Sequence, residues 1–377
     1  MSVASELYVG LMSGTSMDGV DAVLADFAPH GGRPLRVLAH SHRPFDSALA
    51  AELLALNSPG GNELHRAALA ANALARHYAQ AVDEVLDAAN VRRDAVVAVG
   101  AHGQTVRHRP GEFDGVGYTQ QLNQPALLAE LCGIDVVCDF RGRDVAAAGQ
   151  GAPLAPAFHR VMFGSSGETR GVLNLGGIGN LTVLRPDGTT LGFDCGPGNA
   201  LMDHWCARQT GRPFDDGGAW AASGKVLETL LGRLLSDPYF ASAPPKSTGR
   251  DLFNAPWLES NLRAAGAAGA RPEDVQATLA EFTAAVCAND LGRCAPDATE
   301  LIVCGGGAFN RHLLQRLAAR ANGVRVLASS ERGLPPTQVE GCAFAWLARA
   351  FVRRDALALG SITGARGPRV LGALYPR

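Results

Sequence analysis

Short apolar runs alternate with longer stretches of helical periodicity along this chain, and the same order of elements occurs twice. In the first part, runs that end at turn residues predict strands at 7–14, 19–27, 35–40, 95–101 and 134–140. Apolar residues at every third or fourth position predict helices at 62–89 and 125–132. In the second part, the same criteria predict strands at 171–175, 181–185, 190–194 and 301–304, and helices at 199–209, 272–291 and 340–351.

Strand meanders followed by helices, found twice, predict an α/β protein with two lobes. We expect an N-terminal lobe at 1–140 together with the tail 352–377, and a C-terminal lobe at 141–351. The length of 377 residues agrees with this, because a domain typically has about 100–200 residues. Ligands of such folds usually bind in the cleft between lobes.

The composition is that of a globular protein and argues against several classes of partner. Hydrophobic residues make up 47% of the chain and charged residues 19%, which leaves enough apolar surface for sizeable cores. A net charge of −2 provides no basic footprint for nucleic acid. We expect no membrane span and no secretory signal, because long apolar runs and a basic start are absent. Eight cysteines without C-x-x-C spacing fit a reduced cytosol.

Two glycine-rich turns that follow predicted strands carry groups suited to phosphate. They are Gly-Thr-Ser-Met-Asp-Gly at 14–19 and Asp-Cys-Gly-Pro-Gly-Asn at 194–199. Glycines let backbone N–H groups approach phosphate oxygens closely. Each could also be an ordinary hairpin turn, but one such turn in each lobe favours a phosphate clamp. A third cluster, 305–307, could let a nucleotide base or ribose lie on the backbone, or could serve close packing of a strand on a helix.

Two common nucleotide-binding motifs are absent from the sequence. The P-loop pattern fails around Lys225, because Ala219 and Val226 stand at its first and last positions. No complete G-x-G-x-x-G occurs, which argues against a Rossmann dinucleotide site.

A series of motifs resembles those of the anhydro-N-acetylmuramic acid kinase family. The first is Gly-Leu-Met-Ser-Gly-Thr-Ser-Met-Asp-Gly-Val-Asp at 10–21. The others follow in chain order at 102–105, 139–144, 149–154, 174–178, 193–199, 245–250, 304–310, 343–348 and 363–365. Because these motifs run through essentially the whole chain, the resemblance is specific.

The resemblance implies the ribonuclease H-like superfold of sugar kinases, Hsp70 and actin, with ATP in a cleft between two lobes. The implied reaction opens 1,6-anhydro-N-acetylmuramic acid with water and phosphorylates it, giving N-acetylmuramic acid 6-phosphate and ADP during peptidoglycan recycling in the cytoplasm. A homodimer is also implied. The implied ATP-binding residues are Gly14, Thr15, Ser16, Met17, Asp18, Gly19, Val20, Asp21, Gly177, Gly196, Gly198, Asn199, Gly305, Gly306, Gly307 and Asn310. The implied substrate-binding residues are His102, Gln104, Thr105, Gln121, Arg143, Asp194 and Glu340.

The implied chemistry needs one base, and the resemblance points to Asp194. Glycosidases use one carboxylate to activate water and one carboxylic acid to protonate the leaving oxygen. Here the γ-phosphoryl group of ATP would capture O6 and replace that acid. Arg143, with Arg141 as the alternative, is expected to hold the phosphoryl group or substrate near the base. Glu340 is expected to contact the sugar or orient the water.

Phosphoryl transfer normally uses Mg²⁺ to neutralise charge. Asp18 and Asp194 stand in the two phosphate turns and could hold the ion through water.

Each assignment has a structural alternative. Asp194 could be a turn residue, Arg143 a surface ion-pair partner, Glu340 a favourable charge at a helix start and His102 a core histidine. Another small-molecule kinase of the same superfold, or an actin-like nucleotide-switched binding protein, is the functional alternative.

Three positions depart from the family pattern. Asn123 stands where glycine is usual and could adopt a left-handed turn. Cys195 replaces a usual threonine and loses a hydroxyl donor beside the base. Gly341 replaces a more common alanine, which weakens the helix start after Glu340.

Overall fold

Two units, each with its own sheet and core, make up the chain. The computed structural model describes residues 5–14, 17–28, 32–249 and 252–377. The first unit comprises residues 1–162 and 337–377, and the second comprises residues 163–336.

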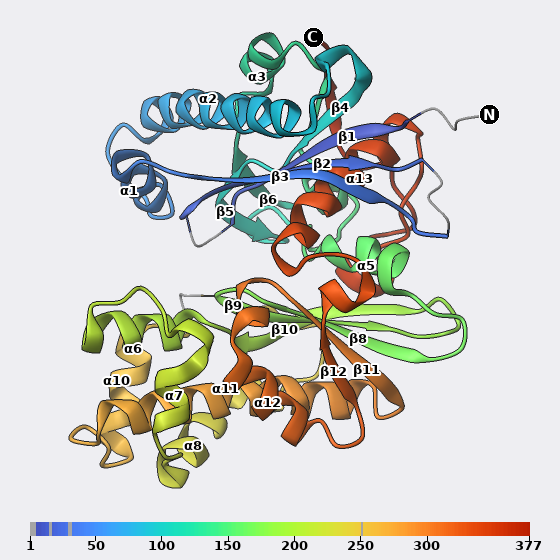
Figure 1. Ribbon diagram of the computed structural model, residues 1–377. Coiled ribbons are helices and arrows are strands. Elements are labelled where there is room, and N and C mark those ends of the chain that lie inside the picture. The colour runs from blue at the N-terminus through green and yellow to red at the C-terminus, as the bar shows by residue number, and fades with distance from the viewer. Residues whose placement is uncertain (1–4, 15–16, 29–31, 250–251) are drawn as a thin grey trace. The chain divides into compact units, whose positions relative to one another are not determined.

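Among the described residues, the sheet of the first unit has six strands in the order β13-β7-β4-β1-β2-β3. Strands β1 to β4 of this sheet are labelled in Figure 1. β1 is antiparallel to β2 and parallel to β4, and β2 continues antiparallel into β3. β7 runs parallel to β4, and β13 is antiparallel to β7. The strands are β1 (Leu7–Met12), β2 (Gly19–Asp26), β3 (Arg36–Pro44), β4 (Val96–Ala101), β7 (Val136–Cys138) and β13 (Ala373–Tyr375). β5 (Gln104–Pro110) and β6 (Gly117–Leu122) form a separate hairpin.

Helices cover both faces of this sheet. Successive residues of β1 point to opposite faces, so this one strand packs against helices on both sides. Leu7, Val9 and Leu11 belong to the core beneath the long helix α2 (Glu63–Ala89). On the other face, α13 (Val339–Val352) approaches so closely that a Cβ on Gly10 would lie 1.9 Å from the Gly341 carbonyl oxygen. The remaining helices are α1 (Ser47–Ala55), α3 (Pro125–Cys132), α4 (Gly142–Ala146), α5 (Ala155–Phe163) and α14 (Gly360–Thr363).

The sheet of the second unit has five strands in the order β10-β9-β8-β11-β12. β8, β9 and β10 are antiparallel neighbours, whereas β11 runs parallel to both β8 and β12. The strands are β8 (Thr169–Leu175), β9 (Ile178–Leu184), β10 (Thr190–Pro197), β11 (Ala298–Cys304) and β12 (Arg325–Ala328).

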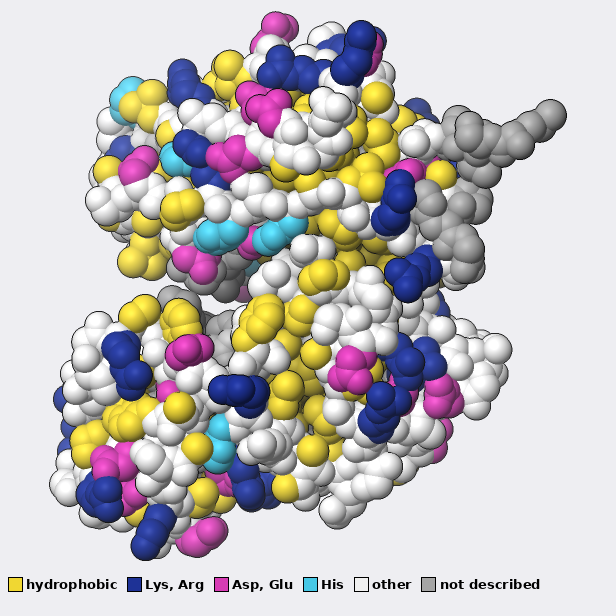
Figure 2. Space-filling view, in the orientation of Figure 1, with side chains coloured by type: hydrophobic (Ala, Val, Ile, Leu, Met, Phe, Trp, Pro, Cys, Tyr) yellow, Lys and Arg dark blue, Asp and Glu magenta, His cyan; other side chains and the backbone are white. Residues whose placement is uncertain are grey.

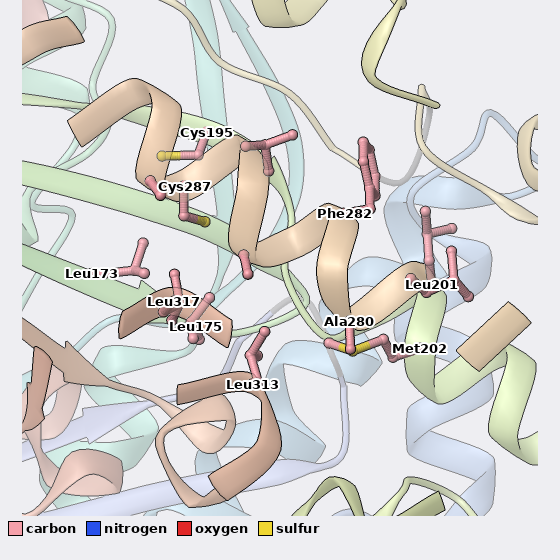
Figure 3. Packing of buried hydrophobic residues seen from close by; sticks show 14 of the residues in the cluster. Leu173, Leu175, Cys195, Leu201, Met202, Ala280, Phe282, Cys287, Leu313 and Leu317 are labelled. Carbon is pink, nitrogen blue, oxygen red and sulfur yellow. The ribbon is translucent and has the colours of Figure 1, made fainter. Parts of the chain in front are cut away.

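Helix α11 (Pro272–Cys294) passes through the core of the second unit. Its side chains are buried on nearly every side, which explains why it shows no polar face. Figure 3 shows Cys287 of this helix beside Cys195 of β10, with Leu173 and Leu175 of β8 nearby. The other helices are α6 (Ala200–Thr210), α7 (Ala219–Ser223), α8 (Glu228–Leu235), α9 (Pro238–Ala241), α10 (Ala255–Ala264) and α12 (Arg311–Arg320).

The two sheets share one topology. In each sheet, the first three strands in the sequence are antiparallel neighbours. The next two strands then add in turn to the free edge of the first strand and run parallel to it. This internal duplication confirms the predicted α/β fold with two repeated halves. The helices predicted at 62–89 and 340–351 are also confirmed, as α2 and α13.

The division of the chain differs from the expected one. Helices α4, α5 and α13 belong to the first unit, although 141–351 was expected to form one lobe. The glycine contact between β1 and α13 explains the difference for α13. A sequence gives no direct sign that a helix starting at 339 packs on a strand starting at 7.

Acidic and basic side chains are interspersed over the face shown in Figure 2, as the near-zero net charge suggests. Within the described ranges, no helix combines the length and the apolar character that crossing a membrane requires.

Candidate active site

The turn between β1 and β2 is supported by side chains of the first unit. Ser13 is buried, and its Oγ bonds to the Tyr78 hydroxyl at 2.8 Å and donates to the Gly103 carbonyl at 3.1 Å. Gln104 donates from Nε2 to the Gly14 carbonyl oxygen at 3.0 Å. The start of the predicted phosphate turn is therefore fixed to the segment that carries His102 and Gln104.

The rest of this turn contains residues with different roles. Met17 has a left-handed φ of 56°, and its amide donates to the Gly14 carbonyl at 3.2 Å. A Cβ on Gly19 would lie 2.4 Å from the Arg43 carbonyl oxygen, so this position requires glycine. Asp18 is exposed. The predicted residues Thr15 and Ser16 lie outside the described residues.

Two further residues predicted to bind ATP lie in β2, past the turn itself. Val20 is fully buried in the core. The Asp21 carboxylate oxygen Oδ1 lies 3.1 Å from His40 Nε2 and 3.1 Å from His42 Nδ1. Both side chains are therefore engaged with their own sheet.

His102, Arg141 and the start of α13 form a polar cluster in the first unit. The imidazole of His102 donates from Nδ1 to the Ser13 carbonyl at 3.3 Å. Its Nε2 then accepts from Arg141, at 2.9 Å from Nη2 and 3.3 Å from Nε. Arg141 also donates from Nη1 to the Gly151 carbonyl at 2.9 Å.

The charges in this cluster follow from burial. Burial, and then the charge of Arg141, lower the pKa of His102 to about 3, so the imidazole is neutral at pH 7. Burial lowers the pKa of Arg141 to about 10, against the charges of Glu340 and Asp144, so the guanidinium stays charged. Burial and the charge of Asp21 raise the pKa of Glu340, and Arg141 opposes this shift.

The structure separates the two arginines between which the sequence did not decide. Arg141 joins His102, whereas Arg143 is exposed on the short helix α4. Asp144 of the same motif is buried and structural: its carboxylate accepts from the Gly151 amide at 2.7 Å and from the Thr363 hydroxyl at 2.9 Å.

Several amide and hydroxyl side chains gather where β5 and β6 begin and end. Gln121 donates from Nε2 to the hydroxyls of Thr105, at 3.3 Å, and Thr119, at 2.8 Å. Among the described residues, the buried Gln104 Oε1 and both side-chain polar atoms of Asn123 have no hydrogen-bond partner. Asn123 does not take the left-handed conformation that the sequence suggested. Such unused donors and acceptors suit a polar ligand such as a sugar.

Asp194 lies in β10 and is held by two hydrogen-bond donors. Its Oδ2 accepts from the Thr248 amide at 3.0 Å, and its Oδ1 accepts a short hydrogen bond from Asn180 Nδ2. The backbone is fixed as well: its amide donates to the Lys246 carbonyl at 3.1 Å, and its carbonyl accepts from the Tyr239 hydroxyl at 2.7 Å. The carboxylate therefore has a defined orientation.

The environment of Asp194 favours a base of raised strength. Burial raises the pKa of this carboxyl above its ordinary value, whereas Thr248, Asn180 and Lys246 act in the opposite direction. The neighbouring Cys195 is fully buried in the core of the second unit, at the point where the pairing of β10 with β9 shifts register. The expected loss of a hydroxyl donor beside the base stays a prediction, and the burial of Cys195 in the core argues against it.

The turns at the ends of β8 and β10 are hydrogen-bonded together. The Gly198 amide donates to the Gly177 carbonyl at 2.9 Å, and the Asn199 amide donates to the Gly176 carbonyl at 2.8 Å. A Cβ on Gly198 would lie 2.4 Å from the Gly176 carbonyl oxygen, and Gly196 has φ 148°. These amides are already used within the turn, so they fix its shape.

The third glycine cluster serves close packing at two of its three positions, which is one of the two roles that the sequence left open. A Cβ on Gly305 would lie 2.4 Å from Asn174 Oδ1, and one on Gly307 would lie 2.5 Å from Leu175 Cβ, so both serve close packing. Gly306 is exposed, and a Cβ added there would have Asn199 Nδ2 as its nearest neighbour, at 3.9 Å. The Asn310 side chain caps α12 by accepting from the Leu313 amide at 2.9 Å.

Sequence reasoning missed the partners of Asp194. Asn180, Tyr239 and Thr248 were not predicted to act, although Thr248 stands in the motif at 245–250. Across the described ranges, His, Cys, Asp and Glu do not gather in threes as a metal site.

The fold is a duplicated α/β fold, with glycine-rich turns after strands of its sheets and an oriented carboxylate beside one of those turns. The family model described as "Anhydro-N-acetylmuramic acid kinase" matches residues 6–377. The chain belongs to this family.

Curated relatives of the same description are similar over their full length. The protein of Variovorax paradoxus (strain S110) is 63% identical, with 99% of this chain and 100% of that protein covered. That of Albidiferax ferrireducens is 58% identical with the same coverage. That of Cupriavidus metallidurans is 57% identical over 99% of this chain and 98% of that protein.

Similar solved structures have low sequence identity. An activator of 2-hydroxyisocaproyl-CoA dehydratase from Clostridium difficile, with bound ADPNP, has a TM-score of 0.49 and 13% identity, covering 92% of this chain and 96% of that chain. A ROK family glucokinase from Streptomyces griseus has a TM-score of 0.41 and 14% identity, covering 91% and 99%. The family assignment rests on the sequence relatives.

Proposed function

We propose that this protein uses ATP and water to convert 1,6-anhydro-N-acetylmuramic acid to N-acetylmuramic acid 6-phosphate, with ADP as the second product. The observation that carries the proposal is the geometry of Asp194. Two donors orient its carboxylate, burial raises its pKa, and a turn rich in glycine follows it directly. The expected context is peptidoglycan recycling in the cytoplasm.

The 1,6-anhydro bond is an internal glycoside, and Asp194 is the base that its opening requires. The carboxylate takes a proton from water as the water oxygen attacks C1. The bond between C1 and O6 breaks, and O6 forms a bond to the γ-phosphorus while ADP leaves. Phosphate capture at O6 replaces the acid of an ordinary glycosidase. This route needs one carboxylate and predicts inversion at C1.

The first unit is proposed to supply charge and hydrogen bonds. Arg141 fits the role expected of Arg143, because His102 and Gly151 hold its guanidinium in place. Gln104 and Asn123 have hydrogen-bonding atoms that no described residue uses, and these are proposed to bind sugar hydroxyl or acetamido groups. Glu340 is proposed to contact the sugar or the water.

Nucleotide binding is proposed to involve the glycine turns. Gly306 leaves room for the flat adenosine. The turns at 14–19 and 196–199 are candidates for the phosphates, with the Gly198 and Asn199 amides already bonded to the turn at the end of β8. Mg²⁺ would supply charge neutralisation of the phosphates when bound. Both carboxylate oxygens of Asp194 already accept hydrogen bonds. This arrangement fits contact through water, with Asp18 as the other candidate.

The direct test is incubation with ATP and the anhydro sugar, followed by detection of ADP and a sugar phosphate. In ¹⁸O-water, the label is expected at C1, and NMR before mutarotation is expected to find the inverted anomer. A retained configuration would indicate a covalent glycosyl-enzyme instead. Formation of ADP with other sugars alone would indicate a different kinase, and nucleotide-dependent polymerisation without product would indicate an actin-like protein. Sedimentation of the purified protein tests the proposed homodimer.

A further inference from the structure

A buried ion pair lies behind Asp194 in the second unit. Lys246 and Asp290 are 4% and 3% exposed, and Lys246 Nζ lies 3.0 Å from Asp290 Oδ2 and 3.3 Å from Oδ1. The Lys246 ammonium also lies over two aromatic rings, 4.9 Å from the centre of Tyr239 and 5.7 Å from that of Phe193. Burial of two charges costs free energy unless both are well paired. A contribution to stability alone therefore does not explain why this pair is buried here.

Lys246 belongs to the segment that contacts Asp194. Its own carbonyl accepts from the Asp194 amide at 3.1 Å, and two residues later the Thr248 amide donates to the Asp194 carboxylate at 3.0 Å. Residues 242–249 have no helix or strand that would fix their backbone. The side chain of Lys246 therefore provides an anchor for a segment that lacks regular structure.

The other end of the anchor is rigid. Asp290 lies in α11, the buried central helix of the second unit, and it also forms a short ion pair with Arg293. Arg293 in turn donates to the carbonyls of Phe240, at 3.2 Å, and Ser242, at 3.3 Å. The same helix thus holds both the α9 end and the Lys246 end of the segment.

We propose that Lys246, paired with Asp290, is a positioning residue that holds the 246–248 segment so that the Thr248 amide orients and stabilises the ionised Asp194 carboxylate. Lys246 does not contact the substrate; it acts through the backbone of its own segment and through its charge. The proposal rests on the proposed role of Asp194 as the base.

Several titratable or charged groups lie in the elements packed around Asp194. Burial raises the pKa of the Tyr239 hydroxyl and of the Cys195 thiol well above their ordinary values, so both are neutral at pH 7. Lys246 is the cation that lowers the pKa of Asp194. Within the described ranges, these groups are Lys246 from the segment, Tyr239 from α9, Cys195 from β10, and Cys287, Asp290 and Arg293 from α11.

The experiment measures the titration of Asp194 directly, by ¹³C NMR of the full-length protein with labelled aspartate. Asp194→Asn identifies the signal. In Lys246→Met, the Asp194 titration is expected to move up by about one pH unit, because a nearby opposite charge and a hydrogen bond are lost. In the coupled kinase assay, the acid limb of kcat is expected to move in the same direction, and kcat at neutral pH to fall on the order of 10–100-fold.

A second variant keeps the test decisive if Lys246→Met folds poorly because the buried Asp290 then keeps only its ion pair with Arg293. Lys246→Met with Asp290→Leu removes both charges, and apolar side chains including Leu235 and Val286 line the space beside Asp290. Replacing both partners of a buried pair is often tolerated. The double variant is expected to fold and still to show the raised Asp194 titration and the reduced kcat.

Glu281→Gln is the matched control. Glu281 is a second buried acid of α11, 3% exposed, and pairs with Arg316 and Arg320 rather than with the segment. Its loss is expected to lower stability and leave the Asp194 titration unchanged.

An unchanged Asp194 titration in a folded Lys246 variant overturns the proposal, and so does an equal shift in Glu281→Gln. If wild-type protein does not turn over the anhydro sugar, the proposed function fails, while the NMR titration still decides the role of Lys246.

Discussion

The backbone amide of Thr248 donates to Oδ2 of Asp194 at 3.0 Å, across 54 positions of the sequence. A strand fixes the carboxylate, and a segment without regular structure supplies its hydrogen bond. A base oriented in this way needs little reorganisation when it accepts a proton. The cost is that its geometry depends on how that segment is held.

Replacement of Asp194 by asparagine is expected to abolish most turnover. Asparagine keeps the shape of the side chain but cannot accept the proton from water. Loss of a general base typically costs roughly 10²–10⁴-fold in rate, and we expect a value toward the upper end, since ring opening and phosphate transfer are coupled. Steady-state kinetics measures this, with calorimetric binding of ATP and sugar as the control for folding. Turnover within about tenfold of wild type would mean that another residue is the base.

The pH dependence of kcat is expected to report the ionisation of the base. Burial raises the pKa of Asp194, and the ionised form is active, so kcat falls as the pH drops through this raised pKa. His102 contributes nothing to this limb above about pH 4, because burial lowers its pKa to about 3. The kcat profile between pH 4 and 8, paired with ¹⁵N NMR of the histidines, measures both. A His102 that becomes charged near pH 6 would contradict this assignment.

Arg141 and Arg143 are expected to differ strongly in function. Arg141→Met removes a guanidinium held by His102 and Gly151, and loss of one electrostatic stabiliser typically costs about 10²–10³-fold in kcat. Arg143→Met changes an exposed side chain and is expected to stay within about 0.5 kcal/mol in stability and near wild type in turnover. Parallel kinetics on the two folded variants distinguishes them. The reverse order of effects would restore Arg143 as the functional residue.

The sequence predicted the parts of the candidate site that lie in continuous motifs. A strand followed by glycine-rich residues is a local pattern and indicated the turns at 196–198 and 305–307, whereas Asp194 was indicated by the family resemblance. Phe193 and Cys195 both lie in the core, but the pairing of β10 with β9 shifts register between 194 and 196, so alternation along the strand alone does not fix the position of Cys195.

Other features depend on contacts between distant residues. The choice between Arg141 and Arg143 depends on His102, 39 positions away from Arg141. The Lys246–Asp290 pair joins residues 44 positions apart. No local sequence pattern indicates either pairing, because each joins residues that only the packing of the folded chain brings together.

Gly306 is expected to tolerate a side chain in the free protein but not in the nucleotide complex. Its Cβ would have open space, with Asn199 Nδ2 the nearest atom at 3.9 Å. Gly306→Ala is therefore expected to fold as wild type and to lose on the order of tenfold in ATP affinity, equal to about 1.4 kcal/mol. Gly305→Ala is the contrast, because its φ is 76° and its Cβ would lie 2.4 Å from Asn174 Oδ1; this variant is expected to lose stability. Calorimetric titration and thermal unfolding measure the two effects, and unchanged ATP affinity in Gly306→Ala would place the adenosine elsewhere.

Gly341 is expected to resist replacement by alanine, although alanine favours helices. Intrinsic propensity alone predicts a gain of about 0.8–1.0 kcal/mol. The added methyl, however, would lie 2.6 Å from Val23 Cγ2 and 3.3 Å from Val23 Cβ, where α13 packs on β2. Overpacking of this kind typically costs about 1–3 kcal/mol, so the packing term wins and Gly341→Ala lowers the free energy of unfolding.

Two further variants separate packing from helix propensity at position 341. Gly232→Ala in α8 is the matched control, because a Cβ there meets nothing within 4 Å, and it is expected to gain stability. Val23→Ala combined with Gly341→Ala makes room for the methyl and is expected to be more stable than the sum of the single changes predicts. Urea unfolding of the wild type, Val23→Ala, Gly341→Ala and the double variant measures the coupling. If Gly341→Ala stabilises as much as Gly232→Ala, the close contact with Val23 is not what requires glycine at the start of α13.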